Sequence, residues 1–212
     1  MNITLIFSLK KYKKVRNAYI SGLSKRLESG KKISSIASVA SFFVSRVDSK
    51  VDPLIECNSN LSEIQKEKLL GSVAISNAIL AYEDFKTDFS NEKFKKLKDH
   101  GAMVQRPLWA STSTKNPKYN NTHYVENLCM KNTINTMPEA TLDSVEKILS
   151  IKKSTSSNDA QYNIQLLEKI NIDLEAITQE LLNEGIQLFS DSYDELQENL
   201  SGKIKNLKKE IK

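Results

Sequence analysis

The chain has 212 residues, of which 39% are hydrophobic and 27% are charged, and its formal net charge is +5. This length fits one domain, and the apolar share is enough for a sizeable core. No apolar run approaches the roughly 20 residues that a membrane-spanning helix needs. We therefore expect a cytoplasmic protein with no membrane partner.

The positive charge does not by itself indicate a nucleic-acid partner. The 31 Lys and Arg residues are spread along the chain and mixed with 26 acidic residues, without a stripe of basic and aromatic residues. Cys57 and Cys129 have no metal-ligand spacing and are expected to be reduced thiols. His100 and His123 stand alone and are expected to be surface or cap residues, so we predict no metal and no cofactor.

The pattern of apolar and polar residues in the first half of the chain predicts alternating strands and helices. Residues 2–7 form a strand-like apolar run, and Ser8 is a natural N-cap for a helix that ends at Gly30. Residues 36–44 form a second buried run. A loop containing Asp52 and Pro53 is expected next. One helix over residues 62–86 and a short helix over residues 92–98 follow.

The second half begins with a third strand, predicted over residues 105–112. Pro107 lies near its start, where a proline is tolerated. A brief fourth strand is predicted over residues 133–137, and Pro138 begins a helix to about residue 150. Residues 152–158 are polar and of low complexity, which indicates a loop.

Four strand–helix units in succession predict an α/β fold with a parallel sheet. We assign residues 1–150 to this part and residues 151–212 to a helical C-terminal extension that packs outside the sheet. One face of a long helix in this extension is apolar, and comprises Leu181, Ile186, Phe189, Tyr193, Leu196, Leu200 and Ile204.

Function in a parallel α/β sheet collects at the carboxyl ends of the strands. Arg46 and Lys115 follow two of these ends, where a cation beside hydroxyl groups suits a sugar phosphate. The alternative is a surface ion pair of Arg46 with Asp48 or Asp52 and a solvated Lys115. The other polar residues in or after the candidate strands are Asn2, Thr4, Ser41, Ser45, Ser111, Thr112, Ser113, Asn135 and Thr136.

Small hydroxyl residues such as Thr4 and Ser41 have a plainer interpretation, because they commonly fill tight sheet interiors and bond locally. Nothing in the chain resembles a Ser-His-Asp arrangement, a P-loop or a GxGxxG motif. The residue pattern alone therefore leaves the phosphate site and the structural role open.

Four stretches at these same strands resemble the transaldolase family, in particular its bacterial branch with the longer chain. They occur in the family's order, and cover much of residues 2–145. They are NITLIFS at 2–8, VASFFVSRVD at 39–48, RPLWASTSTKNP at 106–117 and NTMPEATL at 135–142.

The resemblance implies the C-terminal half of a (β/α)8 TIM-type barrel, with its last four strands, followed by extra C-terminal helices. It also implies a pentose phosphate pathway enzyme that transfers a dihydroxyacetone unit between sugar phosphates through a lysine Schiff base. Fructose 6-phosphate, erythrose 4-phosphate and sedoheptulose 7-phosphate are the substrate class. No metal or organic cofactor is implied.

The resemblance assigns roles to individual positions. Thr4 helps to hold a catalytic water, Asn2 lies beside the lysine strand, and Arg46 binds the phosphate. Ser41 and Ser111 line the sugar chain, and Lys115 stands near the place of a second phosphate-binding arginine. The family's Schiff-base lysine lies on the strand before Asn2 and is absent from this chain.

Half a barrel has open strand edges and an exposed inner face, so we expect this chain to be unstable alone or to assemble with a partner. The partner is either a second copy or a separate N-terminal half. A split gene, a truncated gene or a misplaced start would each give this sequence. Three functions stay open: transaldolase activity with the missing half, an inactive fragment that binds sugar phosphate, and a Schiff base on Lys115 itself.

Overall fold

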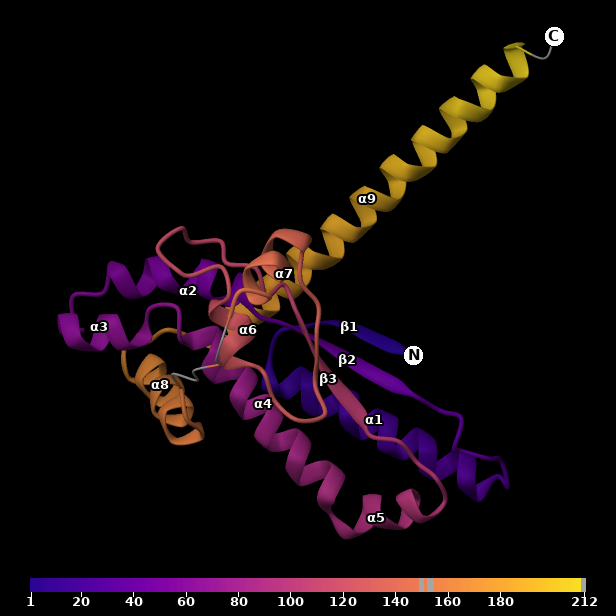
Figure 1. Ribbon diagram of the computed structural model, residues 1–212, viewed down its shortest axis with the longest axis horizontal. Coiled ribbons are helices and arrows are strands. Elements are labelled where there is room, and N and C mark those ends of the chain that lie inside the picture. The colour runs from indigo at the N-terminus through magenta and orange to yellow at the C-terminus, as the bar shows by residue number, and fades with distance from the viewer. Residues whose placement is uncertain (149–150, 152–154, 211–212) are drawn as a thin grey trace.

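A computed structural model describes residues 1–148, 151 and 155–210 and contains a four-stranded parallel sheet (Figure 1). The strands lie in the order β1-β2-β3-β4, with β1 and β4 at the edges. The predicted parallel α/β sheet is confirmed, whereas a barrel is not shown, because the described strands form an open sheet. The strands are β1 (Asn2–Ile6), β2 (Ser38–Phe43), β3 (Gln105–Ala110) and β4 (Ile134–Asn135).

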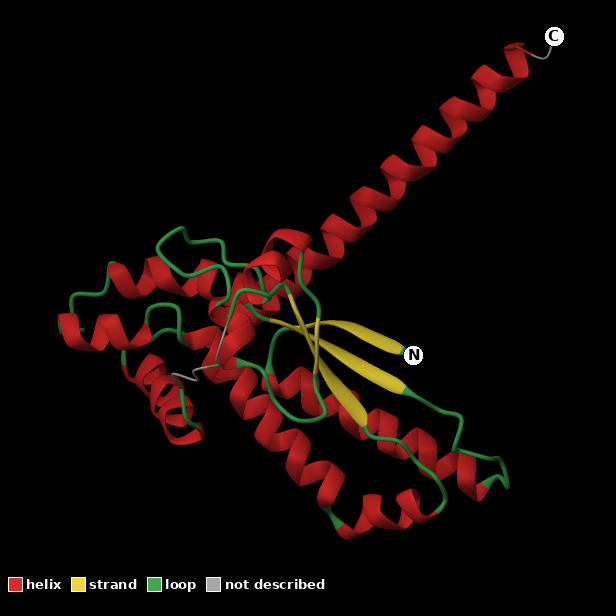
Figure 2. Ribbon diagram, in the orientation of Figure 1, coloured by secondary structure: helices red, strands yellow, loops and turns green. Residues whose placement is uncertain are grey.

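Helices connect the strands and extend the chain beyond the sheet (Figure 2). The first helix begins as predicted, because the Ser8 side chain accepts a hydrogen bond from the Lys11 backbone N–H. The helices are α1 (Leu9–Glu28), α2 (Ser45–Glu56), α3 (Glu63–Leu69), α4 (Val73–Ser90), α5 (Glu92–Asp99), α6 (His123–Asn127), α7 (Glu139–Val145), α8 (Ser157–Lys169) and α9 (Leu174–Glu210).

Two predicted segments between β2 and β3 were wrong. Asp52 and Pro53 lie inside α2 rather than in a loop. The single helix expected over residues 62–86 is two helices, α3 and α4, separated at Gly71, whose φ is +68°. The Gly71 N–H donates to the Asp52 carboxylate, so the Asp52 side chain of α2 stabilises the break between α3 and α4. The helical periodicity carries no sign of such a tertiary bond.

In the second half of the chain, the predicted and the observed elements differ mainly in length. Strand β4 has only two residues, and α6 lies in a stretch for which no helix was predicted. Helix α7 ends at Val145, while residues 149–150 of the helix predicted there lie outside the described residues. The loop predicted over residues 152–158 lies partly outside them too, and α8 begins within it at Ser157.

Helices α1 and α4 lie along one side of the sheet and form the core with it (Figure 1). The Tyr12 ring of α1 meets the Phe42 ring of β2 edge-on, with centroids 5.7 Å apart, and Phe42 meets Trp109 of β3 at 6.0 Å. Asn77 of α4 donates to the Phe7 carbonyl after β1. The side chains that face α1 and α4 belong to alternate residues of the strands, and the residues between them face the opposite side.

Helix α9 packs on the sheet only through its first turns. Leu181 is buried, and Lys50 of α2 forms ion pairs with Glu180 and Glu184. Farther along, α9 leaves the body and runs outward (Figure 1). Helix α8 of the same extension also contributes buried residues to the core, among them Ala160 and Leu167. Within the described part of the chain, no helix is both long enough and apolar enough to cross a membrane.

Candidate functional site

The face of the sheet that points away from α1, called the open face here, carries three of the predicted site residues, of which Ser41 is buried. Ile3 pairs with Ala40 and faces α1, so Asn2 and Thr4 point to the opposite face by strand alternation. Ser41 shares this face and donates from Oγ to Asn2 Oδ1 at 2.8 Å. Thr4 is exposed. The structure therefore brings Asn2, Thr4 and Ser41 into one polar row across β1 and β2.

Arg46 is the second residue of α2, directly after the carboxyl end of β2. The N-cap residue is Val44, whose side chain accepts no hydrogen bond from the first turn; the Ser45 and Val47 N–H groups donate to backbone carbonyls. Arg46 is half-buried, and among the described residues its guanidinium has no hydrogen bond or ion pair. A helix N-terminus without a side-chain cap, next to an unpaired arginine, favours a bound anion.

The alternative ion pairs of Arg46 are not formed. The Asp48 carboxylate accepts from the Ala74 N–H at 2.7 Å and from the Tyr124 hydroxyl at 2.9 Å. The Asp52 carboxylate accepts from the Gly71 N–H and from a tyrosine hydroxyl. Both carboxylates are therefore engaged with neighbouring segments, and neither pairs with Arg46.

Ser111 links the ends of β2 and β3. Its hydroxyl lies 3.0 Å from the Ser45 hydroxyl, and its carbonyl accepts the Ser45 N–H at 2.9 Å. Ser111 has a φ of +56°, a left-handed conformation that is unfavourable for a serine and is held here by these two bonds. The strand end thus places Ser111 against the first residue of α2, beside Arg46 in the sequence.

Lys115 lies in a different setting. It is exposed, and its Nζ donates to the Ser113 hydroxyl at 3.0 Å. It lines a cavity of about 250 Å³ together with Asp48, Asp52 and Glu56. Arg46 does not line this cavity. The structure therefore places Lys115 beside carboxylates and does not join it with Arg46 in one cavity.

Two polar groups beyond the predicted roles lie between β3 and β4. The buried Thr112 donates from Oγ1 to Asn135 Oδ1 at 2.8 Å and lies 2.9 Å from the Thr136 carbonyl. The Asn135 Nδ2 is buried without a partner among the described residues. Their positions at strand ends were visible in the sequence, but their mutual bond depends on the strand register.

A buried carboxyl group behind α2 was not predicted as part of the site. Burial first, and then the neighbouring Asp52, raises the pKa of Asp48 to about 8. Burial likewise raises the pKa of Asp52. Asp48 holds the first half of α2 against the N-terminus of α4, and so positions Arg46 indirectly. Only the tertiary contacts distinguish Asp48 from an ordinary helix-surface aspartate.

The remaining candidates from the sequence take structural positions. His100 is the C-cap residue of α5, and His123 Nε2 lies 2.7 Å from the Gly71 carbonyl. Cys57 and Cys129 are exposed and unpaired. In the part of the chain that the structure describes, no group of three His, Cys, Asp or Glu residues could hold a metal ion.

Comparison with known proteins gives a consistent picture. The family described as transaldolase/fructose-6-phosphate aldolase matches residues 1–200. A transaldolase of Mycolicibacterium smegmatis is 42% identical over 212 residues, which cover 99% of this chain and 56% of the relative. Transaldolase 2 of Streptomyces coelicolor is 40% identical, with 98% and 56% covered. Transaldolase 2 of Nostoc punctiforme is 44% identical, with 98% and 57% covered. The chain therefore spans little more than half the length of these relatives.

Proposed function

Because this chain belongs to the transaldolase/fructose-6-phosphate aldolase family, we propose that it forms the sugar-phosphate-binding side of a transaldolase. The reaction transfers a dihydroxyacetone unit from a ketose phosphate to an aldose phosphate. Fructose 6-phosphate, sedoheptulose 7-phosphate and erythrose 4-phosphate are the proposed substrates, and the pentose phosphate pathway in the cytoplasm is the proposed setting.

The observation that carries this proposal is Arg46 at the N-terminus of α2, unpaired within the described part of the chain. A phosphate dianion accepts two parallel hydrogen bonds from a guanidinium, and the first-turn N–H groups of a helix add a favourable dipole. Val44 at the N-cap offers no side-chain oxygen to the first turn, in which the Ser45 and Val47 N–H groups already donate to the Ser111 and Val44 carbonyls. The Ser111 hydroxyl, which lies 3.0 Å from the hydroxyl of the buried Ser45, is proposed as a further contact to the ligand.

The polar row on the open face is proposed to bind the rest of the sugar. Ser41 is held by Asn2, which fixes the direction of its hydroxyl. Thr4 lies next along β1 and is proposed to hold the water that moves protons during the reaction. Ser111 is proposed to line the phosphate end of the bound sugar. Lys115 is proposed as a weaker phosphate contact, because it is exposed and lies among carboxylates.

The Schiff-base lysine is proposed to come from outside the matched half. A primary amine condenses with the substrate carbonyl, releases water and gives an iminium ion, which stabilises the carbanion left after C–C cleavage. The part of the chain before residue 151 is proposed to be the half barrel, and residues 151–212 its helical extension. The amine then belongs to a separate N-terminal half, or to another part of a longer chain.

The edge of the sheet offers a surface for that half. Strand β1 has one neighbour among the described strands, so its other side is open for a further parallel strand. Beside it lies an apolar cavity of about 440 Å³ between Ile3 of β1 and α1, lined by Val15, Tyr19 and Leu23. A strand and helix placed before β1 would cover both.

A second candidate function is a non-catalytic fragment that binds sugar phosphate only. The same Arg46 site supports it, since binding requires no lysine nucleophile. A third, in which Lys115 itself forms the Schiff base, has little support. Lys115 is exposed, whereas a lysine nucleophile is commonly activated by removal from water in an apolar pocket.

The phosphate site is tested by titrating fructose 6-phosphate and inorganic phosphate into the purified chain by calorimetry. Loss of a charged, bidentate hydrogen bond in Arg46→Ala is expected to weaken binding of both ligands about tenfold or more. Arg26→Ala is the control, because Arg26 lies in the last turn of α1 and donates to the Lys32 carbonyl. Equal binding by Arg46→Ala and the control would exclude Arg46 as the phosphate ligand.

A further inference from the structure

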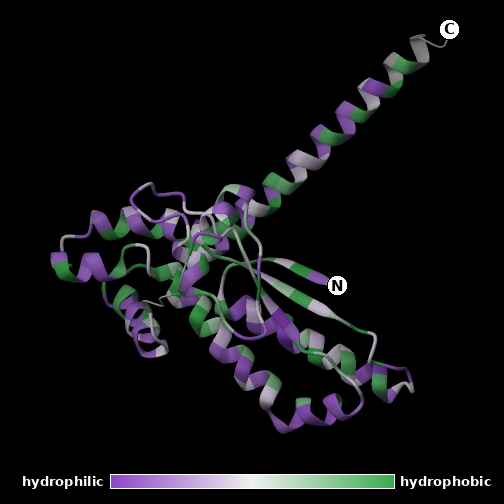
Figure 3. Cartoon of the chain, in the orientation of Figure 1, coloured by the Kyte–Doolittle hydropathy of each residue, from purple (hydrophilic) through white to green (hydrophobic). Residues whose placement is uncertain are grey.

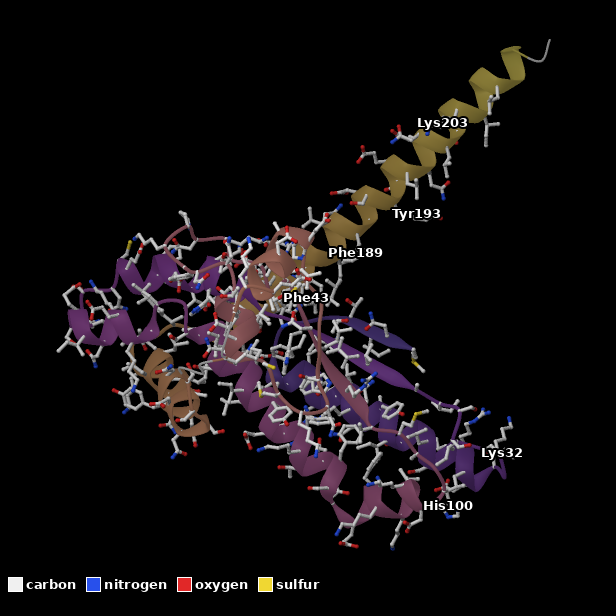
Figure 4. The ribbon with its side chains drawn as sticks, in the orientation of Figure 1. Lys32, Phe43, His100, Phe189, Tyr193 and Lys203 are labelled. Atoms are coloured by element: carbon white, nitrogen blue, oxygen red, sulfur yellow. The ribbon has the colours of Figure 1, made fainter. Side chains whose placement is uncertain are left out.

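Residues 186–210, the outer part of α9, are called the arm, and its apolar side chains are exposed. Leu181 is 3% exposed, whereas Phe189 and Tyr193 are each 60% exposed and lie on the part of α9 that has left the body (Figure 4). We call the exposed apolar residues of the arm the arm stripe. It comprises Ile186, Phe189, Tyr193, Leu196, Leu200, Ile204 and Leu207, all more than half exposed.

The spacing of the arm stripe indicates a helical partner. Its members follow one another at intervals of three and four residues from Ile186 to Leu207, which is about three heptads. Figure 3 shows the corresponding apolar bands between hydrophilic ones along the arm. Helix propensity alone gives an isolated helix little stability, and Gly202 lowers the helix propensity of the arm further. The helical arm therefore needs a surface that buries its stripe.

The charges of the arm are separated along its length. Residues 191–198 contain four acidic residues and no basic residue, whereas residues 203–210 contain four lysines and one glutamate. Two such arms side by side in the same direction place like charges together. In opposite directions, the acidic segment of each arm lies beside the basic segment of the other.

We propose that the arm of α9 pairs with the arm of a second copy of this chain as an antiparallel two-helix coil. A two-fold axis near Leu200 sets Leu196 opposite Ile204 and Tyr193 opposite Leu207. The same axis sets residues 191–198 opposite residues 202–209. The contact is symmetric and closes as a dimer, and it leaves the β1 edge of each copy open. It does not depend on the proposed enzymatic activity.

The competing occupant of the arm stripe is the part of a transaldolase that this chain does not match. That part is proposed above to cover the β1 edge, and it could reach the arm as well. The separation of acidic and basic segments along the arm favours the second copy over this competing occupant. The reason is that an antiparallel second arm complements both segments without any further component. A chain that is monomeric by itself would favour the competing occupant.

The dimer is tested by sedimentation equilibrium of the purified chain and of two matched variants. Leu196→Asp places a charge in the arm stripe and is expected to raise the dimer dissociation constant at least tenfold. Leu188→Asp is the control, because Leu188 is 49% exposed on the same helix but lies off the stripe. A monomeric wild-type chain, or a dimer that Leu196→Asp leaves intact, would overturn the proposal.

The direction of the pair is tested by disulfide crosslinking in a background with Cys57→Ser and Cys129→Ser. Chains with Tyr193→Cys are expected to crosslink with chains that carry Leu207→Cys when the two are mixed. Tyr193→Cys chains alone are expected to crosslink poorly. The reverse, efficient crosslinking between two Tyr193→Cys chains, would show a parallel pair and contradict the charge argument.

Discussion

Single residues at the start of α2 decide how the proposed phosphate site is built. Arg46 meets no partner among the described residues, while Asp48 and Asp52 farther along α2 are turned toward α4 and the loop after β3. The sequence could identify Arg46 as a candidate from its place after a strand. It could not exclude an ion pair with Asp48, since that depends on which side chains approach from distant segments.

The planar fork of Arg46 is expected to matter as well as its charge. Arg46→Lys keeps one positive charge but loses the bidentate geometry, so we expect phosphate affinity between those of the wild type and Arg46→Ala. The measurement is the same calorimetric titration at two salt concentrations. If Arg46→Lys binds as tightly as the wild type, the site uses a point charge rather than a fork.

The raised pKa of Asp48 is expected to make the stability of the protein depend on pH. Its pKa is raised to about 8, whereas an aspartate in the unfolded chain titrates near 3.9. Between these values the native state keeps a proton that the unfolded state has released. The free energy of unfolding is therefore expected to fall as pH rises from about 4 to 8, by at most about 1.4 kcal/mol per pH unit.

Asp48→Asn removes this titration and is expected to flatten the pH profile, as measured by urea unfolding at intervals from pH 5 to 8. Asp52 keeps a slope of the same sign, because burial raises its pKa too. The exposed Asp99→Asn is the control and should retain the wild-type slope. Parallel profiles for wild type and Asp48→Asn would contradict the assigned pKa.

At the scale of elements, the strands and the ends of several helices were predictable, because apolar runs and caps are local signals. The N-cap at Ser8 and helix α5 lie where the sequence places them. The break between α3 and α4 was missed, because the stretch keeps its helical periodicity; Gly71, which has a φ of +68° and donates to Asp52, was the local signal for it. Strand β4 is shorter than predicted and pairs with Leu108 and Trp109 of β3.

Gly71 is expected to tolerate no side chain. Its φ is +68°, and a Cβ there would lie 2.8 Å from the Tyr119 ring. Gly71→Ala is expected to cost more than the roughly 1–2 kcal/mol of the left-handed backbone alone. Gly30→Ala is the matched control, with a φ of +71° and nothing within 4 Å. Equal losses in urea unfolding would show that Tyr119 moves aside freely.

At the scale of the whole molecule, the four transaldolase-like stretches are enough to identify the family and to indicate a half-length match from the amino-acid sequence alone. The open sheet edge and the apolar cavity beside α1 are the surfaces that such a half is expected to leave. The outward course of α9 was not predicted. Its periodicity indicates an amphipathic helix equally well whether the partner is the sheet or another molecule.

The central claim is that this chain supplies the substrate-binding side and that the Schiff-base lysine lies elsewhere. The direct measurement is borohydride trapping with fructose 6-phosphate, read by intact-mass spectrometry. The chain would be tested alone and mixed with the part of the Mycolicibacterium smegmatis transaldolase that it does not match. We predict no adduct on the chain alone, and in the mixture an adduct on the added part only. A covalent sugar adduct on this chain by itself would contradict the account.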